Sequence, residues 1–252
     1  MNPQDLKAAF DRDGFVIVRQ FAPDDEFREL TTNLDRYIRE VVPTLPDSSA
    51  FYQDAGRLET LKQMQHMGVD PFFEAYPTRA RWTELAATLV GEEVNGQEPE
   101  WFNKPPGTEH PTPPHQDNFY FCLKPPNVLT LWLALDPVDE ENGCLRYVRS
   151  SHVGGIRPHG PTAVLGFSQS VIDYGPTDEA LVEPMFLEPG DLVAHHGETI
   201  HRAEPNRSAT RHRRAFAMVF QGTSCSRDEA AFQRYQDSVK KQHQLKGLKV
   251  DD

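Results

Sequence analysis

From about residue 98 to residue 222, short apolar segments alternate with clusters of proline and glycine. The chain has 21 prolines and 16 glycines, and proline interrupts both helices and central strands. Short strands separated by turn residues are typical of β-sandwiches and of closed barrels such as the jelly roll. This pattern predicts that the region forms a mainly β fold.

Six segments in this region have the apolar and β-branched character of strands, and Asn142-Gly143 between two of them predicts a β-hairpin turn. Residues 155–189 form a long stretch interrupted by Gly and Pro, which predicts a lid or a binding loop. The predicted strands are Trp101–Asn103, Phe119–Leu123, Val128–Leu135, Cys144–Val148, Leu192–His195 and Ala215–Phe220.

The flanking regions carry helical patterns. The N-terminal part predicts a strand over Phe15–Val18 and helices over Leu6–Arg12, from Pro23 to about Val41, and over Arg81–Val90. Near the other end, Ser226 and Glu229 form a capping-box pattern, followed by Phe232, Tyr235 and Val239 at helical spacing. We therefore expect one domain over residues 1–252, with an N-terminal extension to about residue 95, a core from about 96 to 222, and a C-terminal helix over about 226–246.

Composition limits the partners of the chain. The 252 residues include 38% hydrophobic side chains, which is enough for one sizeable core, and the net charge is −12. A strongly acidic chain is not expected to bind nucleic acid or an anionic membrane, although a local basic pocket for a small anion is compatible with it. Three cysteines at scattered positions, and the lack of an apolar signal or spanning segment, predict a soluble cytoplasmic protein. The expected partner is a small-molecule substrate.

His115-Gln116-Asp117 is a candidate for two ligands of a divalent metal. On a β-strand, the alternation of side chains puts His115 and Asp117 on one face and turns Gln116 away. A second His from a distant strand would complete a 2-His-1-carboxylate set, which suits non-haem Fe(II) oxygenases. With 10 His and 38 acidic residues, His-x-acid occurs about once or twice by chance, and His196-Gly197-Glu198 is a second match. We favour the first match because it adjoins an aromatic segment with strand character.

Four histidines are candidates for the second imidazole ligand: His195, His196, His201 and His212. His201 is followed by a cluster of arginines, most of which are expected to be solvated. One of them, pointing inward, could bind the distal carboxylate of a 2-oxoglutarate cosubstrate through its guanidinium fork. The cluster consists of Arg207, Arg211, Arg213 and Arg214.

Several motifs, in the same order along the chain, resemble the phytanoyl-CoA dioxygenase family. The resemblance covers most of the chain, including Asp13-Gly14-Phe15-Val16 at the start. The further motifs are WFNKPPG (101–107), PHQDNFYF (114–121), WLALD (132–136), ENGC (141–144), GDLVAHHGETIH (190–201), Asn206-Arg207-Ser208 and Arg213-Arg214-Ala215.

The resemblance implies a double-stranded β-helix, or cupin-like jelly roll, with flanking helices. It also implies an enzyme that uses Fe(II), 2-oxoglutarate and dioxygen, with ascorbate as a stimulant. By position, His115, Asp117 and His201 match the iron ligands, and His196 matches a histidine that is not a ligand. Arg213 matches the cation that binds the distal carboxylate of the cosubstrate, with Lys104, Trp132 and Thr130 expected nearby. Arg211 competes with Arg213, because the interval after Asn206 is one residue longer than in the family.

The carboxylate of Asp117 favours hydroxylation over halogenation, since related halogenases have a small residue there. The resemblance implies hydroxylation of an unactivated C–H of a small polar metabolite, with an organophosphonate such as 2-aminoethylphosphonate as the narrower expectation. Lys104, Arg157 and Lys62 are cations available to a phosphonate. The alternatives are a hydroxylase of a free amino acid or another natural-product intermediate, a zinc hydrolase on the same three ligands, and a non-catalytic jelly-roll binding module.

Overall fold

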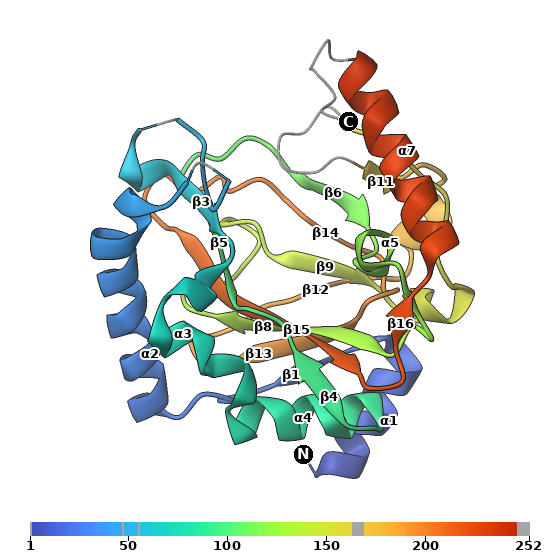
Figure 1. The fold of residues 1–252 in the computed structure, drawn as a ribbon, viewed down its shortest axis with the longest axis horizontal. Coiled ribbons are helices and arrows are strands. Elements are labelled where there is room, and N and C mark those ends of the chain that lie inside the picture. The colour runs from blue at the N-terminus through green and yellow to red at the C-terminus, as the bar shows by residue number, and fades with distance from the viewer. Residues whose placement is uncertain (1, 47, 55, 163–168, 246–252) are drawn as a thin grey trace.

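Two antiparallel β-sheets face each other across the centre of the molecule (Figure 1). The computed structural model describes residues 2–46, 48–54, 56–162 and 169–245. The larger sheet has eight strands and the smaller has four. In spatial order, the larger sheet contains β1 (Phe15–Val18), β13 (Leu192–His196), β8 (Val128–Ala134), β15 (Arg213–Gly222), β5 (Glu100–Lys104), β3 (Leu61–Met64) and β2 (Ala50–Tyr52), with β4 (Val94–Gly96) paired to β15.

The smaller sheet carries strands from distant parts of the chain. Its order is β12 (Val182–Pro184), β9 (Leu145–Val148), β14 (His201–Ala203) and β6 (Thr112–His115). Strands β8, β13 and β15 lie in the larger sheet, whereas β9, β12 and β14, which are interspersed among them along the chain, lie in the smaller one. This arrangement confirms the predicted jelly roll.

The alternation of side chains along β8 divides the interior into two layers. Leu129, Leu131 and Leu133 project to the outer face and join the main hydrophobic core. Trp132 and Ala134 project to the inner face and pack in a second cluster between the sheets. All of β8 is buried, because the strand is covered on both faces. The inner face is the one available for a site between the sheets.

Helices cover the outer face of the larger sheet and close the main core (Figure 1). The side chains of Leu6, Leu30, Trp82 and Leu89 are buried there against β8 and β15. The helices in this region are α1 (Pro3–Asp13), α2 (Asp24–Arg36, continued by a π-helical turn over Tyr37–Val41), α3 (Pro71–Glu74) and α4 (Ala80–Val90). The helices predicted from the N-terminal sequence are therefore present.

The predicted strand over Phe119–Leu123 is wrong. Asn118–Phe121 form a short helix, α5, and only Leu123–Lys124 (β7) pair as a strand, with β16 (Ser226–Arg227). The Asn118 side chain accepts a hydrogen bond from the Leu123 amide and donates one to the Leu123 carbonyl, which holds the turn closed. Specific contacts thus override the β propensity of three aromatic residues.

The predicted hairpin at Asn142-Gly143 is also wrong, because the strands before and after it belong to different sheets. The dipeptide still makes a tight turn. The Asn142 amide donates to the carbonyls of Pro137 and His212. Gly143 has a φ of +84°, and a Cβ there would lie 2.5 Å from the Glu204 carbonyl oxygen. The turn therefore connects the two sheets, which a hairpin signal does not reveal.

The C-terminal helix, α7, runs over Glu229–Leu245 and packs against α5 through Tyr235. Its start differs from the predicted capping box, since Asp228 accepts from the Ala231 amide while Ser226 belongs to β16. The side chain of Val239 and residue 246 of the predicted helix lie outside the described residues.

The long segment expected as a lid contains β10 (His159–Pro161), β11 (Gln169–Val171) and α6 (Pro176–Glu179) ahead of β12. Residues 163–168 of that segment lie outside the description. All three cysteines carry free thiols. Across the described ranges, the helices are each too short or too polar to cross a membrane.

Candidate metal centre

His115 and His201 lie directly opposite each other on the neighbouring strands β6 and β14. Both side chains are buried, and their rings are 4.1 Å apart between centroids. Each Nδ1 faces a backbone carbonyl, Pro113 at 2.8 Å and Thr199 at 3.0 Å. A proton on each Nδ1 satisfies these carbonyls and leaves each Nε2 as a lone-pair donor, which fixes the tautomer that binds a metal.

Asp117 brings its carboxylate to the same point. Its Oδ1 lies 3.5 Å from Nε2 of His115 and 3.6 Å from Nε2 of His201. The potential ligand atoms of the three residues all lie within 4.8 Å of one another. Asp117 reaches this position from the αR conformation just after β6 ends, so the expected alternation along one strand is not what aligns it with His115.

The second carboxylate oxygen of Asp117 is held by two further side chains. Its Oδ2 accepts from the Thr130 hydroxyl at 2.8 Å and lies 3.0 Å from Nε2 of His195. The Tyr147 hydroxyl lies 2.9 Å from Nδ1 of His195. Burial raises the pKa of Tyr147, so the hydroxyl keeps its proton and donates to His195, whose Nε2–H donates to Asp117. One oxygen, Oδ1, therefore remains for a metal.

These contacts give His195 and Thr130 functions that the sequence did not predict. His195 was a candidate ligand, but its Nε2 faces the ligand Asp117. Thr130 was expected near the distal carboxylate of a cosubstrate, but its hydroxyl is bonded at the metal end. Nothing in the sequence pattern His195-His196 distinguishes a metal ligand from a residue that supports a metal ligand.

The chemistry of the donor set fits a divalent metal of borderline softness. Burial is the main reason that the pKa of His201 lies well below its usual value, and the neighbouring His115 contributes. The His201 imidazole is therefore in its neutral, metal-binding form. Two imidazole nitrogens and one carboxylate oxygen on one side of an ion leave the remaining positions open. That arrangement suits non-haem Fe(II), and three ligands with an open position also suit zinc.

Two buried basic side chains lie side by side on the inner face of the larger sheet, which faces the smaller sheet that carries His115 and His201. Lys104 of β5 and Arg213 of β15 are paired in register, and both side chains are buried. The Arg213 guanidinium lies 5.4 Å from the ring centroid of Trp132. Burial lowers the pKa of Arg213 to about 10, and burial together with the Arg213 charge lowers that of Lys104 to about 6.

Neither cation has a carboxylate partner within ion-pair distance among the described residues. Lys104 donates to the carbonyls of His110, Ala203 and Glu204, at 3.3, 3.4 and 2.6 Å, and Nε of Arg213 has no hydrogen-bond partner there. An isolated buried charge is costly unless a partner compensates it. Within the part of the chain that the structure describes, this pair therefore lacks a compensating anionic side chain.

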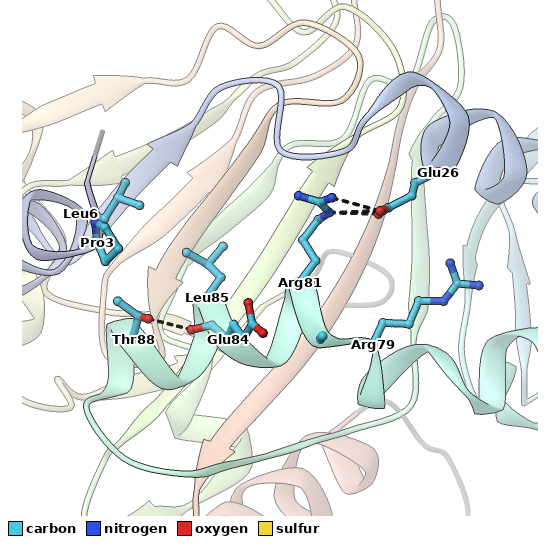
Figure 2. Close-up of a pocket in the computed structure, with 9 residues that line it drawn as sticks. Pro3, Leu6, Glu26, Arg79, Arg81, Glu84, Leu85 and Thr88 are labelled. Carbon is cyan, nitrogen blue, oxygen red and sulfur yellow. Dashed lines mark hydrogen bonds and ion pairs between the residues drawn. The ribbon is translucent and has the colours of Figure 1, made fainter.

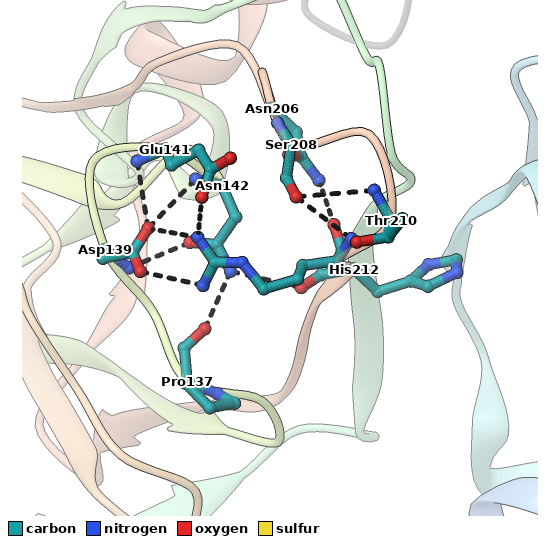
Figure 3. A network of polar contacts seen from close by, with 9 residues as sticks. Pro137, Asp139, Glu141, Asn142, Asn206, Ser208, Thr210 and His212 are labelled. Carbon is teal, nitrogen blue, oxygen red and sulfur yellow. Dashed lines mark hydrogen bonds and ion pairs between the residues drawn. The ribbon is translucent and has the colours of Figure 1, made fainter.

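Arg211 does not share this position. Its guanidinium forms ion pairs with Asp139 and Glu141 on the loop before β9, part of the polar network of Figure 3. The same network includes Asn206, which accepts from the Ser208 amide and donates to the Arg211 carbonyl. Arg213 is thus the inward-pointing member of the predicted arginine cluster.

The other candidates lie away from the metal group. His196 projects to the opposite face from His195 and packs against Phe10 of α1. Glu198, from the second His-x-acid match, lies 3.4 Å from the Asn118 amide nitrogen. His212 contacts Asn103 at 3.3 Å.

Gln116 is buried and links three backbone segments. Its amide nitrogen donates to the carbonyls of Gly155 and Glu198, and its oxygen accepts from the Arg157 amide. The Tyr120 hydroxyl donates to the Gln169 carbonyl. Gln116 therefore points away from the metal, as predicted. Its hydrogen bonds stabilise the loops that contain Gly155, Arg157 and Glu198.

A surface hollow of about 850 Å³ lies on the other side of the larger sheet (Figure 2). Arg81 of α4 and Glu26 of α2 form an ion pair beside it, and Leu6 and Leu85 supply apolar walls. The hollow borders the helices of the outer layer, so the sheet separates it from His115, Asp117 and His201.

The family model described as phytanoyl-CoA dioxygenase (PhyH) matches residues 10–215 of the chain, which include every residue of the metal group and both buried cations. The chain belongs to the phytanoyl-CoA dioxygenase family. It is therefore an Fe(II)- and 2-oxoglutarate-dependent oxygenase, and the donor set described above fits that chemistry.

Relatives from plants and animals are similar over most of the chain. A phytanoyl-CoA dioxygenase of Arabidopsis thaliana is 24% identical over 86% of this chain and 88% of its own length. The peroxisomal phytanoyl-CoA dioxygenase of Homo sapiens is 23% identical over 86% of this chain and 67% of its own length.

Solved structures support the same fold. EvdO2 from Micromonospora carbonacea var. aurantiaca, complexed with 2-oxoglutarate, is 27% identical with a TM-score of 0.70, covering 90% of this chain and 93% of its own. EctD from S. alaskensis, solved with 2-oxoglutarate and 5-hydroxyectoine, is 16% identical with a TM-score of 0.72, covering 89% and 77%. Because EctD is 16% identical to this chain, its similarity is evidence for the jelly-roll fold alone.

Proposed function

We propose that the protein hydroxylates an unactivated C–H bond of a small polar metabolite, with His115, Asp117 and His201 as the iron ligands. The observation that supports this most strongly is the presence, in the space between the two sheets, of an open three-ligand group and a pair of buried basic side chains that can receive an anion. A zinc hydrolase needs the ligands but not the buried cations, and a binding module needs neither.

We assign the distal carboxylate of 2-oxoglutarate to Arg213, with Lys104 beside it. The guanidinium supplies a planar fork for a carboxylate, and the Trp132 ring limits where the fork can turn. A dianionic cosubstrate would compensate both buried cations. Because the pKa of Lys104 is depressed to about 6, binding of the dianionic cosubstrate would also favour protonation of the Lys104 amine.

Iron, 2-oxoglutarate and dioxygen together supply the oxidant for C–H hydroxylation, with loss of CO2 and formation of succinate. The protein itself orients the iron ligands and excludes water from the site. Thr130 and His195 hold one oxygen of Asp117, so that the other faces the metal position. The two sheets exclude bulk water from the inner face, which limits side reactions. The carboxylate of Asp117 occupies the position that a halide would need, which favours hydroxylation over halogenation.

Arg213→Lys tests the cosubstrate assignment. The variant keeps a positive charge but loses the fork, so we expect KM for 2-oxoglutarate to rise by about 10- to 100-fold. Arg211→Lys is the matched control and should leave that KM unchanged, because Arg211 pairs with Asp139 and Glu141 instead. The assignment is wrong if both variants have the KM of the wild type.

For the substrate, we propose an organophosphonate such as 2-aminoethylphosphonate as the first candidate, with a free amino acid or another natural-product intermediate as the alternative. Of the three cations suggested for a phosphonate, Arg157 is bound by Asp173 and Asp178, and Lys104 is assigned to the cosubstrate. Lys62 is partly buried, burial lowers its pKa, and it has no ion pair with another described residue. Succinate formation that depends on aminoethylphosphonate would support this choice, and its absence would favour the alternatives.

A further inference from the structure

The second ionisable group of β5, Glu100, lies on the inner face of the larger sheet. Glu100 is paired in register with Ala217 of β15, which is paired with Trp132 of β8. Directly paired residues of antiparallel strands project from the same face. Ala217 and Trp132 belong to the cluster between the sheets, so Glu100 faces that space as well.

Within the described part of the chain, the side-chain hydrogen-bond donor to Glu100 is an amide. Nε2 of Gln63 donates to Oε2 of Glu100 at 3.2 Å. Gln63 is paired with Phe102 on β3, and Phe102 packs against the cluster between the sheets, so Gln63 shares the inner face. No Lys, Arg or His among the described residues lies within ion-pair distance of Glu100.

This carboxylate is partly buried rather than fully exposed. Its side chain keeps partial solvent access, yet the surrounding protein raises its pKa, and the charge of Asp117 contributes to the same shift. Asp117 is similarly 16% accessible. Glu100 and the iron-ligand position therefore border the same interior region, with Glu100 on the β3–β5 side of the larger sheet (Figure 1).

Three other carboxylates of low exposure are each paired with an arginine, whereas Glu198 is bound by the Asn118 amide. Asp70 binds Arg36, Asp191 binds Arg19 and Asp136 binds Arg214, each at 2.8 Å or less. Glu100 lacks such a partner, although an uncompensated, partly buried carboxylate is costly. A purely structural function would be served by the hydrogen bond to Gln63 alone, which a glutamine could make without a charge.

We propose that Glu100 binds a positively charged group of the substrate, such as a primary ammonium, and that it thereby determines the substrate class. This inference rests on the proposed function, since it places the substrate beside the iron ligands. Gln63 acts as a positioning residue that orients the carboxylate. The inner face then has two ends of opposite charge, with Arg213 and Lys104 for the anionic cosubstrate and Glu100 for a cationic substrate group.

The test compares matched pairs of compounds that differ only in an ammonium or a hydroxyl group. The pairs are 2-aminoethylphosphonate with 2-hydroxyethylphosphonate, alanine with lactate, and β-alanine with 3-hydroxypropionate. Compound-dependent succinate formation is measured with Fe(II), 2-oxoglutarate and air. We expect the wild type to prefer at least one ammonium member, and Glu100→Gln to lower kcat/KM for that compound by about 10- to 100-fold, the strength of one charge-assisted contact.

Glu98→Gln is the matched control, because it removes an exposed carboxylate two residues away that lies near His66. It should keep the preference of the wild type. Gln63→Leu should raise KM for the ammonium compound while changing kcat little, because it loosens the carboxylate without removing its charge.

A separate measurement distinguishes failure of this inference from failure of the proposed function. Under anaerobic conditions, the visible absorption band of the Fe(II)–2-oxoglutarate complex should form in both the wild type and Glu100→Gln, and its absence from the wild type would refute the proposed function. If the band forms, the inference about Glu100 is overturned by a wild type that does not distinguish any ammonium compound from its hydroxyl partner, or by a preference that Glu100→Gln retains.

Discussion

At the scale of single residues, the metal centre depends on hydrogen bonds to atoms that do not bind the metal. Pro113 and Thr199 carbonyls fix the tautomers of two imidazoles, and Thr130 and His195 hold one oxygen of Asp117. Such contacts commonly change metal affinity by about 10- to 100-fold when they are removed. The ligands are thus oriented before an ion arrives.

Replacing His195 tests this orientation. His195→Phe removes the donor to Asp117 and leaves the Tyr147 hydroxyl without its partner, so we expect the dissociation constant for Fe(II) to rise by about 10- to 100-fold. Anaerobic calorimetric titration with Fe(II) measures it. His212→Phe is the control, since that ring contacts Asn103 outside the metal group. Equal affinity of the His195 variant and the wild type would show that Asp117 needs no such support.

At the scale of elements, the sequence predicted only part of the sheets. All but one of the predicted strands are present, among them β8, β13 and β15, but β6 and β14, which carry His115 and His201, were not among the predicted strands. α5 was mispredicted because local contacts of Asn118 with Leu123 hold a turn there. The turn at Asn142-Gly143 was mispredicted because it is fitted to the distant residues His212 and Glu204. The resemblance to the family supplied the candidate iron ligands and Arg213, whereas the function of Thr130 and the supporting role of His195 depend on three-dimensional contacts that no motif encodes.

Gln116 makes three-dimensional contacts of this kind, and its replacement is expected to lower the stability of the fold. It joins the segment between β6 and α5 to the backbone at Gly155, Arg157 and Glu198. Gln116→Leu would leave these three groups without their partner, so we expect a loss of about 3 to 5 kcal/mol in the free energy of unfolding.

Urea denaturation measures this loss. Gln97→Leu is the control, because Gln97 is exposed, and it should change the free energy of unfolding by less than about 0.5 kcal/mol. A Gln116 variant as stable as this control would mean that water replaces the three hydrogen bonds.

At the scale of the whole molecule, several buried histidines link stability to pH. Burial lowers the pKa of His196 to about 4, with the neighbouring His152 contributing. The unfolded chain therefore binds a proton between pH 6.5 and pH 4 that the folded chain does not bind. The stabilising contribution is complete above pH 6.5 and is lost as the pH falls toward 4.

His196→Asn isolates this contribution from that of the carboxyl groups. We expect the variant to lose less stability than the wild type when the pH is lowered from 7 to 5, as measured by urea denaturation at each pH. An equal loss in both proteins would show that His196 is protonated in the folded state.

The central claim is that the space between the two sheets binds Fe(II) through His115, Asp117 and His201 and binds 2-oxoglutarate through Arg213. The most direct measurement is an anaerobic titration of the Fe(II)-loaded protein with 2-oxoglutarate, followed through the visible absorption band of the chelate. The account predicts a saturable band for the wild type, a band that needs about 10- to 100-fold more 2-oxoglutarate in Arg213→Lys, and no band in His115→Ala. A band of equal strength and midpoint in all three proteins would contradict it.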